Sequence, residues 1–393
     1  MAKLIRETFD WKETAAFEGD AAVSSALLDL PFDHIFFTGS PAIGKVVMAA
    51  AAKHLAAVTL ELGGKSPVIV DESADIAKAA KSIAWGKFTN CGQTCIAPDY
   101  AFVHESRMPQ FIEAMKESIA KMYSDPARSP DYCRIINGKH FARISHLIED
   151  AAEHGATILA GGERDEAQKF IVPTLLTGAG EDAAIMREEI FGPVLPVLSY
   201  QDLAEPIAAI NARPKPLALY VYAKNFARVE RMLRETSAGG SCVNASNIQF
   251  SHDNLPFGGI GNSGLGNAHG FYGFRAFSHE RAVLEDKFSI VPMVSALHEA
   301  RRGTLLFGQG RLWLEMFQKH DQSVADLAEL LAVARNIRQH VGLDIRLARL
   351  AEVDYEAELA PDRTKKRRPR VDRLNDVAGQ RQFEYRHASS PMI

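Results

Sequence analysis

The sequence predicts an α/β protein built around a parallel sheet. Residues 34–70 alternate between short buried strands and a helix, which is the strand–helix–strand unit of such a sheet. The alternation continues to about residue 245, and 393 residues with 47% hydrophobic content can bury the core of two or three domains. The formal net charge of −4 gives no electrostatic reason to expect nucleic acid or a membrane surface as a partner.

The first unit is defined by the turn between its strand and its helix. Gly39 lets the chain turn, Ser40 is placed to cap the helix, and Pro41 suits the first helical turn. The Ala- and Lys-rich segment that follows favours a helix. The expected elements are a strand at 35–38, a helix at 43–55, and strands at 58–60 and 68–70.

Later elements follow the same alternation of apolar runs and helical segments. The expected helices are 74–88, 109–122, 140–154 and 203–211. The expected strands are 100–103, 157–159, 195–200, 217–222 and 239–244, with a closing strand at 277–284. Residues 256–274 are rich in glycine and are expected to form a loop.

The composition changes after about residue 293. Segment 294–393 carries many charges and no strand pattern, and Ser323 and Asp326 form a capping box for one helix that ends near Gly342. The basic run 365–370 is typical of a solvated, disordered tail, and contact with nucleic acid is the alternative interpretation.

The cellular compartment is predicted from what the sequence lacks. The N-terminus has no apolar core of a signal peptide, and no apolar stretch reaches the about 18 residues of a spanning helix. Four cysteines in so long a chain fit a reducing compartment rather than a disulfide framework. We therefore expect a cytoplasmic protein.

Cys95 and Glu61 are the residues best suited to covalent chemistry. Cys95 follows Gly92, which permits close approach of a substrate, and its own N–H can stabilise an oxyanion. Glu61 ends an apolar strand, where burial would raise its pKa and make it a general base. The alternatives are an inert buried cysteine, a metal site shared with Cys91, and a glutamate that faces solvent.

Two further segments could bind a nucleotide. The helix start at 39–44 offers free N–H groups and a helix dipole to a phosphate, although an ordinary capped helix would look the same. Glu189 precedes Phe191 in a Gly-Pro turn. A carboxylate there can hold ribose hydroxyls, and an aromatic ring can flank a planar ring. The alternative is a surface turn with Phe191 in the core.

Together these segments resemble the aldehyde dehydrogenase superfamily in residue sequence, order and spacing. The resemblance is closest to the class 3-like branch, which includes fatty- and coniferyl-aldehyde dehydrogenases. The resemblance covers roughly residues 15–293. The stretches that carry it are 60–67, 84–98, 187–194, 255–266 and 273–279.

The resemblance implies that the chain oxidises an aldehyde to a carboxylic acid with NAD or NADP, and that no metal takes part. Cys95 would form a thiohemiacetal and then a thioester, and Glu61 would activate the water that hydrolyses the thioester. The cofactor-binding residues implied are Gly39, Ser40, Gly44, Leu62, Glu189 and Phe191. The family also suggests a homodimer.

The implied domains are a remnant of the cofactor-binding domain at 1–60, a catalytic domain at 61–260, a closing segment at 261–293 and a helical, partly disordered extension at 294–393. Family members usually carry a longer preceding segment with a Trp-Asn pair, whereas Trp11 is followed by lysine and Trp85 by glycine here. An alternative is therefore a truncated, catalytically impaired relative with a structural or interaction role.

Overall fold

The structure is a computed structural model that describes residues 1–285. The helix expected after Ser323 and the basic run at 365–370 lie outside the described residues. The predicted α/β class is confirmed, because two sheets with parallel strand pairs are combined with helices along the described part of the chain. None of the helices among residues 1–285 is both long and apolar enough to cross a bilayer.

Within the described residues, the larger sheet has seven strands in the order β11-β10-β3-β4-β9-β8-β5. All neighbouring pairs are parallel except β5 and β8, which are antiparallel. The strands are β3 (Pro67–Val70), β4 (Tyr100–His104), β5 (Thr157–Ala160), β8 (Thr174–Thr177), β9 (Val194–Tyr200), β10 (Ala218–Tyr222) and β11 (Gly240–Val243).

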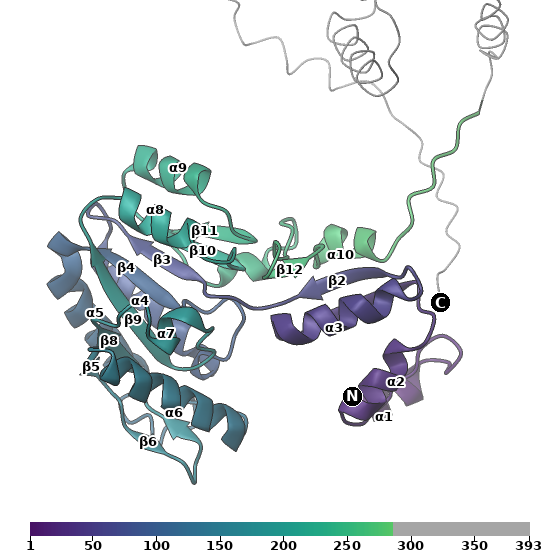
Figure 1. Ribbon diagram of the computed structural model, residues 1–393, viewed down its shortest axis with the longest axis horizontal. Helices are drawn as coiled ribbons and strands as arrows, with labels where there is room; N and C mark the ends of the chain where they lie inside the picture. The colour runs from purple at the N-terminus through teal and green to yellow at the C-terminus, as the bar shows by residue number, and fades with distance from the viewer. Residues whose placement is uncertain (286–393) are drawn as a thin grey trace, which may run out of the picture. The chain divides into compact units, whose positions relative to one another are not determined.

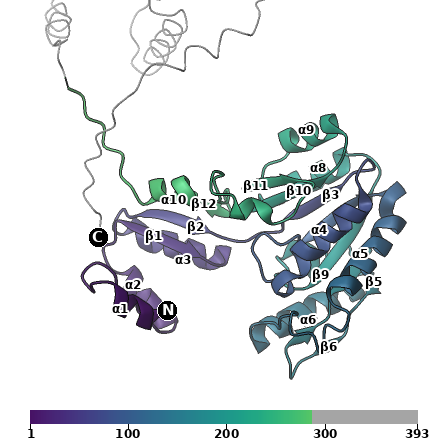
Figure 2. The same ribbon diagram turned by 180° about the vertical axis from the view of Figure 1, so that it is seen from behind.

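Helices cover this sheet, and all four residues of β3 are buried, as expected of a parallel sheet covered on both faces. Figure 1 and Figure 2 show α8 and α9 beside β10 and β11, whereas α4 and α5 pack against each other near β4. The helices are α4 (Ile76–Phe88), α5 (Met108–Met122), α8 (Ala204–Asn211) and α9 (Phe226–Glu235).

A smaller sheet of the described region has three strands in the order β1-β2-β12. β1 (His34–Thr38) and β2 (Ala57–Glu61) are parallel, and β12 (Gly264–Leu265) pairs antiparallel with β2. Helix α3 (Pro41–Ala52) connects the first two strands, so the predicted strand–helix–strand unit is confirmed. Its small core includes Val47, Leu60 and Leu62.

The remaining elements are short or lie outside the sheets. They are α1 (Ala2–Thr8), α2 (Ala21–Leu28), α6 (Gly138–Glu153), α7 (Ala184–Arg187), α10 (Gly270–Ala276), the hairpin of β6 (Arg164–Asp165) and β7 (Phe170–Ile171), and the 3-10 turns η1 (Thr89–Gly92), η2 (Glu105–Arg107) and η3 (Ile248–Ser251).

Side-chain caps determine where two predicted helices begin. The carboxylate of Asp75 accepts a hydrogen bond from Lys78 N at 3.3 Å, so α4 starts two residues later than expected. Asn137 accepts from His140 N at 2.9 Å, which starts α6 two residues earlier than expected.

Two predictions for the end of the described region are wrong. Residues 277–284 form no strand, because a strand needs a neighbour for its backbone hydrogen bonds and no described strand pairs with them. The expected loop at 256–274 contains β12 and most of α10. Leu60 and Glu61 recruit β12 by pairing with Leu265 and Gly264, a long-range contact that the glycine-rich composition does not indicate.

Candidate active site

The loop that carries Cys95 has an unusual backbone. Asn90, Cys91 and Gly92 adopt φ angles of 53°, 54° and 70° in succession, directly after α4 ends. The position of Gly92 tolerates no side chain, since a Cβ there would lie well under 3.0 Å from the carbonyl oxygen of Gly192. Backbone strain of this kind must be supported by neighbouring groups.

Gln93 supplies much of that support. Its Nε2 donates to the carbonyl oxygens of Asn90 and Arg134, each at 3.1 Å, and its Oε1 accepts from Ile136 N at 3.0 Å. The side chain therefore ties the loop both to itself and to the segment before α6. Two residues later, Cys95 is partly exposed and packs against the hydrophobic core, so both the reactive and the inert interpretation of this thiol stay predictions.

The Cys95 thiol is protonated at neutral pH. Burial is the main effect that raises the pKa of Cys95 to about 11, and the charges of Glu189 and Glu61 add to it. The backbone N–H groups of Cys95 and Ile96 donate toward the sulfur and oppose this rise. A thiol in this state needs a base before it can act as a nucleophile.

Glu61 has the properties of such a base. It is the last residue of β2 and only 6% exposed, so the alternative of a solvent-facing glutamate is wrong. Neither carboxylate oxygen has a hydrogen-bond partner within the described part of the chain. Burial raises the pKa of Glu61 to about 7, and its charge is close enough to Cys95 to raise the pKa of that thiol.

Glu189 directs its carboxylate toward the residues that follow Glu61. A Cβ at Gly63 would lie well under 3.0 Å from both oxygens of that carboxylate, and Gly64 N–H donates to it. Burial, followed by the charge of Asp99, raises the pKa of Glu189 to about 7. Glu61 and Glu189 thus both lie close enough to Cys95 for their charges to raise the pKa of its thiol.

The start of α3 lies beside the end of β2. Ser40 accepts from Ile43 N at 3.4 Å, and Gly39 N donates to the carbonyl oxygen of Glu61 at 3.0 Å. Gly44 packs against Leu62 so closely that a Cβ on Gly44 would lie 2.7 Å from Leu62 Cδ2. The four residues of this region expected to bind a cofactor therefore surround the strand that ends in Glu61.

A cleft of about 850 Å³ opens beside this cluster. It is lined by the first residues of α3, by Gly64 and Lys65, by Glu189 and by Asn262. Of the residues predicted to bind a cofactor, Ser40 and Glu189 line the cleft. Gly39, Gly44, Leu62 and Phe191 do not line it: Leu62 is buried under Gly44, and Phe191 is 37% exposed on a backbone with φ of 45°.

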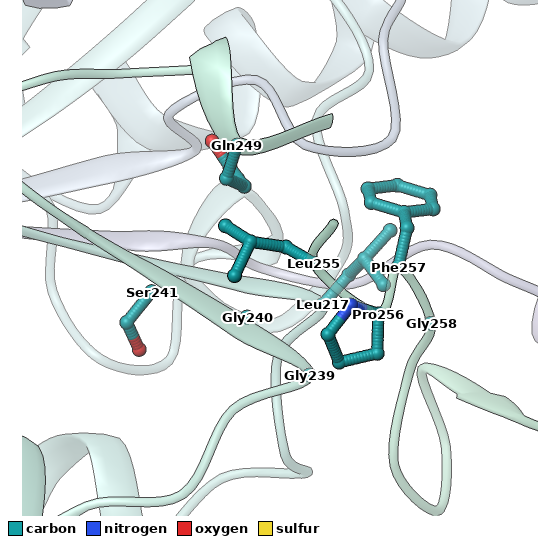
Figure 3. A pocket seen from close by; sticks show the side chains of 9 residues that line it. All are labelled: Leu217, Gly239, Gly240, Ser241, Gln249, Leu255, Pro256, Phe257 and Gly258. Carbon is teal, nitrogen blue, oxygen red and sulfur yellow. The ribbon is translucent and has the colours of Figure 1, made fainter. Parts of the chain in front are cut away.

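A second, smaller cavity of about 200 Å³ lies where the loop at 255–258 meets β10 and β11, and none of the predicted site residues lines it. Figure 3 shows Leu255, Pro256 and Phe257 close together on one side of it, which makes its wall largely apolar. Among residues 1–285 no group of three or more His, Cys, Asp or Glu side chains could hold a metal ion. Cys91 instead donates to the carbonyl oxygen of Cys133 at 2.7 Å.

Comparison with known proteins decides the family. The profile of the aldehyde dehydrogenase family matches residues 17–283. The chain belongs to the aldehyde dehydrogenase family. The predicted resemblance is thereby confirmed, and the motifs quoted from the sequence fall within the matched region.

Two curated aldehyde dehydrogenases illustrate the relationship. The chain is 46% identical over 297 residues to the 4,4'-diaponeurosporen-aldehyde dehydrogenase of Staphylococcus aureus, covering 75% of this chain and 63% of the relative. It is 45% identical over 285 residues to the dimeric NADP-preferring aldehyde dehydrogenase of the rat, covering 72% and 62%. The chain thus spans less than two thirds of the length of these relatives.

Solved aldehyde dehydrogenase structures share the fold. The substrate-bound state of Staphylococcus aureus AldH superposes with a TM-score of 0.70 at 43% identity, covering 77% of this chain and 67% of that one. The NAD+ complex of the aldehyde dehydrogenase from Bacillus cereus superposes with a TM-score of 0.60 at 32% identity, covering 65% and 52%.

Sequence reasoning missed the charged residues around Glu189. Lys65, Asp99 and Arg143 all bond to the segment that carries Glu189, and Lys87 is 1% exposed nearby. The one signal in the sequence was Lys65, which directly follows two glycines. The other residues could not be grouped from the sequence, because each comes from a different part of the chain and only the fold brings them together.

Proposed function

We propose that this chain oxidises an aldehyde to a carboxylic acid with NAD+ or NADP+ as the hydride acceptor. The observation that supports this most is the combination of a protonated thiol, Cys95, with a buried carboxylate, Glu61, that lacks a hydrogen-bond partner within residues 1–285. An unpartnered carboxylate with a pKa of about 7 can take a proton from a thiol or from water and release it again at neutral pH.

In the first half of the reaction, Glu61 removes the proton of Cys95 and the sulfur attacks the aldehyde carbon. The resulting thiohemiacetal places its oxygen near the Cys95 N–H, which already points toward the sulfur. When bound, the nicotinamide cofactor supplies the hydride acceptor, and loss of the hydride converts the thiohemiacetal into a thioester.

Between the two halves, Glu61 releases the proton of Cys95 to solvent, so that in the second half it acts again as a base. It removes a proton from a water molecule, and the hydroxide that forms attacks the thioester carbon. The sulfur leaves as a thiolate, the carboxylic acid is released, and Cys95 regains its proton. The balance is one aldehyde, one water and one oxidised cofactor giving one acid, one reduced cofactor and one proton.

The residues of the cleft fit such a cofactor. The N-terminus of α3 contributes partial positive charge, which favours a phosphate group. The carboxylate of Glu189 offers acceptors to ribose hydroxyls in the same cleft. Ser40 and Glu189 would therefore hold the pyrophosphate and ribose portions, and Leu62 beneath Gly44 would support the wall between the cleft and Glu61.

Aldehyde oxidation is tested by NADH or NADPH formation at 340 nm with medium-chain and aromatic aldehydes at saturating cofactor. Activity is expected in the original chain and lost in Cys95→Ala. Cys133→Ala is the matched control, because Cys133 is an exposed thiol with no role in the proposed steps, and it should retain activity. No absorbance increase with either cofactor would reject the proposal.

A nitrophenyl ester separates thiol chemistry from hydride transfer. Acylation of Cys95 by the ester needs no cofactor and is read by mass spectrometry. A Cys95 adduct without any NADH formation would support the impaired relative that the sequence left open, with the covalent step retained and the oxidation lost.

We also propose that the chain forms a homodimer. The rat relative is named dimeric, and β11 stands at an edge of the seven-stranded sheet with Val243 42% exposed. Light scattering on the purified chain should give twice the mass of 43.1 kDa, and a monomeric mass at micromolar concentration would contradict this.

A further inference from the structure

The segment that presents Glu189 is not part of a helix or strand. It lies between the end of α7 at Arg187 and the start of β9 at Val194, and Phe191 within it has φ of 45°. A segment without regular hydrogen bonds cannot hold a side chain by itself, so its position depends on the groups that satisfy its backbone.

Lys65 satisfies one backbone group of this segment and one of the preceding helix α7. Its Nζ donates to the carbonyl oxygen of Ile185 at 2.7 Å and to that of Glu188 at 2.9 Å. The same Nζ forms an ion pair with Asp99, and both side chains are less than 10% exposed, at 9% and 4%. A buried pair of this kind keeps its geometry only when the remaining donors and acceptors are also used.

Asp99 and Arg143 bind the two residues at the centre of the segment. Asp99 Oδ1 accepts from Ile190 N at 2.9 Å. Arg143, on α6, donates through one Nη to the carbonyl oxygen of Glu189 at 3.0 Å and through the other to that of Ile190 at 2.6 Å. The backbone of Glu189 and of the residues on either side of it is therefore held from three separate parts of the fold.

We infer that Arg143, Lys65 and Asp99 are positioning residues that fix the backbone of Glu189 so that its carboxylate stays over Gly63 and near Cys95. None of the three is assigned a step in the proposed reaction. The inference rests on the proposed function for its consequence in catalysis, but the effect of the Glu189 charge on Cys95 can be measured without cofactor or aldehyde.

Arg143 is the residue to change. Loss of Lys65 or Asp99 would leave a buried charge without its partner, which is strongly destabilising and would obscure the result. The hydrogen bonds of Arg143 in the described region go to carbonyl oxygens of the segment, so its removal loosens Glu189 without breaking a salt bridge.

The readout is the reactivity of the Cys95 thiol. Charged Glu189 raises the pKa of Cys95, so moving or neutralising Glu189 should lower that pKa and speed alkylation. Arg143 also lowers the pKa of Glu189, hence its loss makes Glu189 less charged at a given pH and acts in the same direction. The ionisable groups that face Glu189 are Lys65, Lys87, Asp99, Arg143 and Cys95.

The experiment measures iodoacetamide alkylation of Cys95 between pH 7 and 10 by mass spectrometry of its peptide. Arg143→Met and Glu189→Gln should each speed alkylation about three- to ten-fold at pH 9, the effect of lowering a thiol pKa by about half to one unit. Arg143→Lys can restore one of the two hydrogen bonds, so its alkylation rate should fall between those of the original chain and of Arg143→Met. Cys133, which is exposed, serves as the internal reference.

The double variant Arg143→Met/Glu189→Gln distinguishes positioning from general loosening. If Arg143 acts through Glu189, the double variant reacts no faster than Glu189→Gln alone. Arg164→Met is the control, because Arg164 bonds to the carbonyl oxygen of Ser145 and to the carboxylate of Glu149 on the same helix, and none of its hydrogen bonds within residues 1–285 reaches the segment of Glu189. The pH profile of Cys95 alkylation in this variant should equal that of the original chain. Circular dichroism checks that each variant is folded.

Three results would overturn the inference. The first two are an unchanged pH profile of Cys95 alkylation in Arg143→Met or in Glu189→Gln. The third is faster alkylation in the double variant than in Glu189→Gln alone. Failure of aldehyde oxidation is seen separately in the 340 nm assay and leaves these comparisons readable.

Discussion

The carboxylate of Glu189 occupies the space directly over Gly63, at a position where a Cβ on residue 63 would lie well under 3.0 Å from both oxygens. This contact joins the strand end that carries Glu61 to the segment between α7 and β9. It also explains why a glycine stands at position 63, since any side chain there would displace the carboxylate.

Gly63→Ala should therefore displace Glu189. The expected outcome is weaker NAD(P)H binding, measured by fluorescence titration, with a loss of about 1–3 kcal/mol of stability from the forced rearrangement. Gly138→Ala is the matched control, because a Cβ at Gly138 would find no atom within 4 Å and Gly138 does not line the cleft. Equal cofactor affinity in the two variants would contradict the importance of this contact.

Gly92→Ala should damage the loop that carries Cys95. An alanine at φ of 70°, pressed against the backbone carbonyl of Gly192, cannot be relieved by a side-chain movement. We expect a loss of about 1–3 kcal/mol in urea unfolding. Gly138→Ala, at the first position of α6 with no atom within 4 Å of its Cβ, should be neutral or slightly stabilising.

Gln93→Ala removes three hydrogen bonds, one to Asn90 within the loop and two that connect the loop to Arg134 and Ile136. The expected cost is about 1–3 kcal/mol, because each bond contributes about 1 kcal/mol net. Placement of Cys95 should suffer as well, so the acylation rate with a nitrophenyl ester should fall. Gln168→Ala, which removes an exposed amide bonded to Asp165 at 2.9 Å, should leave both quantities unchanged.

Glu61 should make the protein less stable as the pH rises. Its folded-state pKa of about 7 lies above the ordinary value of 4.5, so between these values the folded state binds more protons than the unfolded state. The contribution of Glu61 to stability is thus fully present below about pH 4.5 and is lost as the pH rises through 7.

Glu61→Gln tests this dependence with urea unfolding at pH 5 and pH 8. The decrease in stability between the two pH values should be smaller in the variant than in the original chain. Part of the decrease will remain, because the pKa of Glu189 is also raised to about 7. The same variant should lose aldehyde oxidation by about 10²–10⁴-fold, the usual contribution of a general base. An identical pH dependence in both proteins would show that Glu61 is not held protonated by burial.

Sequence reasoning was most successful where one local signal was sufficient. The turn at Gly39, Ser40 and Pro41 predicted the start of α3, and apolar runs predicted the strands of the larger sheet except β8, which was missed. The closing strand at 277–284 was predicted wrongly, because an apolar run shows that a strand could form and not whether a partner strand lies beside it.

The same distinction between local signals and tertiary contacts applies to the candidate site. Cys95 and Glu61 were predicted from their residue types and flanking glycines, and their roles stay predictions. Their electrostatic state could not be read from the chain. Burial makes the pKa of Glu61 about 7 and that of Cys95 about 11, and burial is a property of the surrounding fold.

By itself the amino-acid sequence determined the α/β class and the family and predicted Cys95 and Glu61 as the reactive residues, because each depends on residue types within short stretches of chain. Only the tertiary structure decided how Glu189 is held. Lys65, Asp99 and Arg143 lie far apart along the chain, and each meets the same irregular segment only after the strands and helices have packed. Their hydrogen bonds satisfy backbone groups that a buried loop cannot leave unpaired, which is the physical reason for the arrangement.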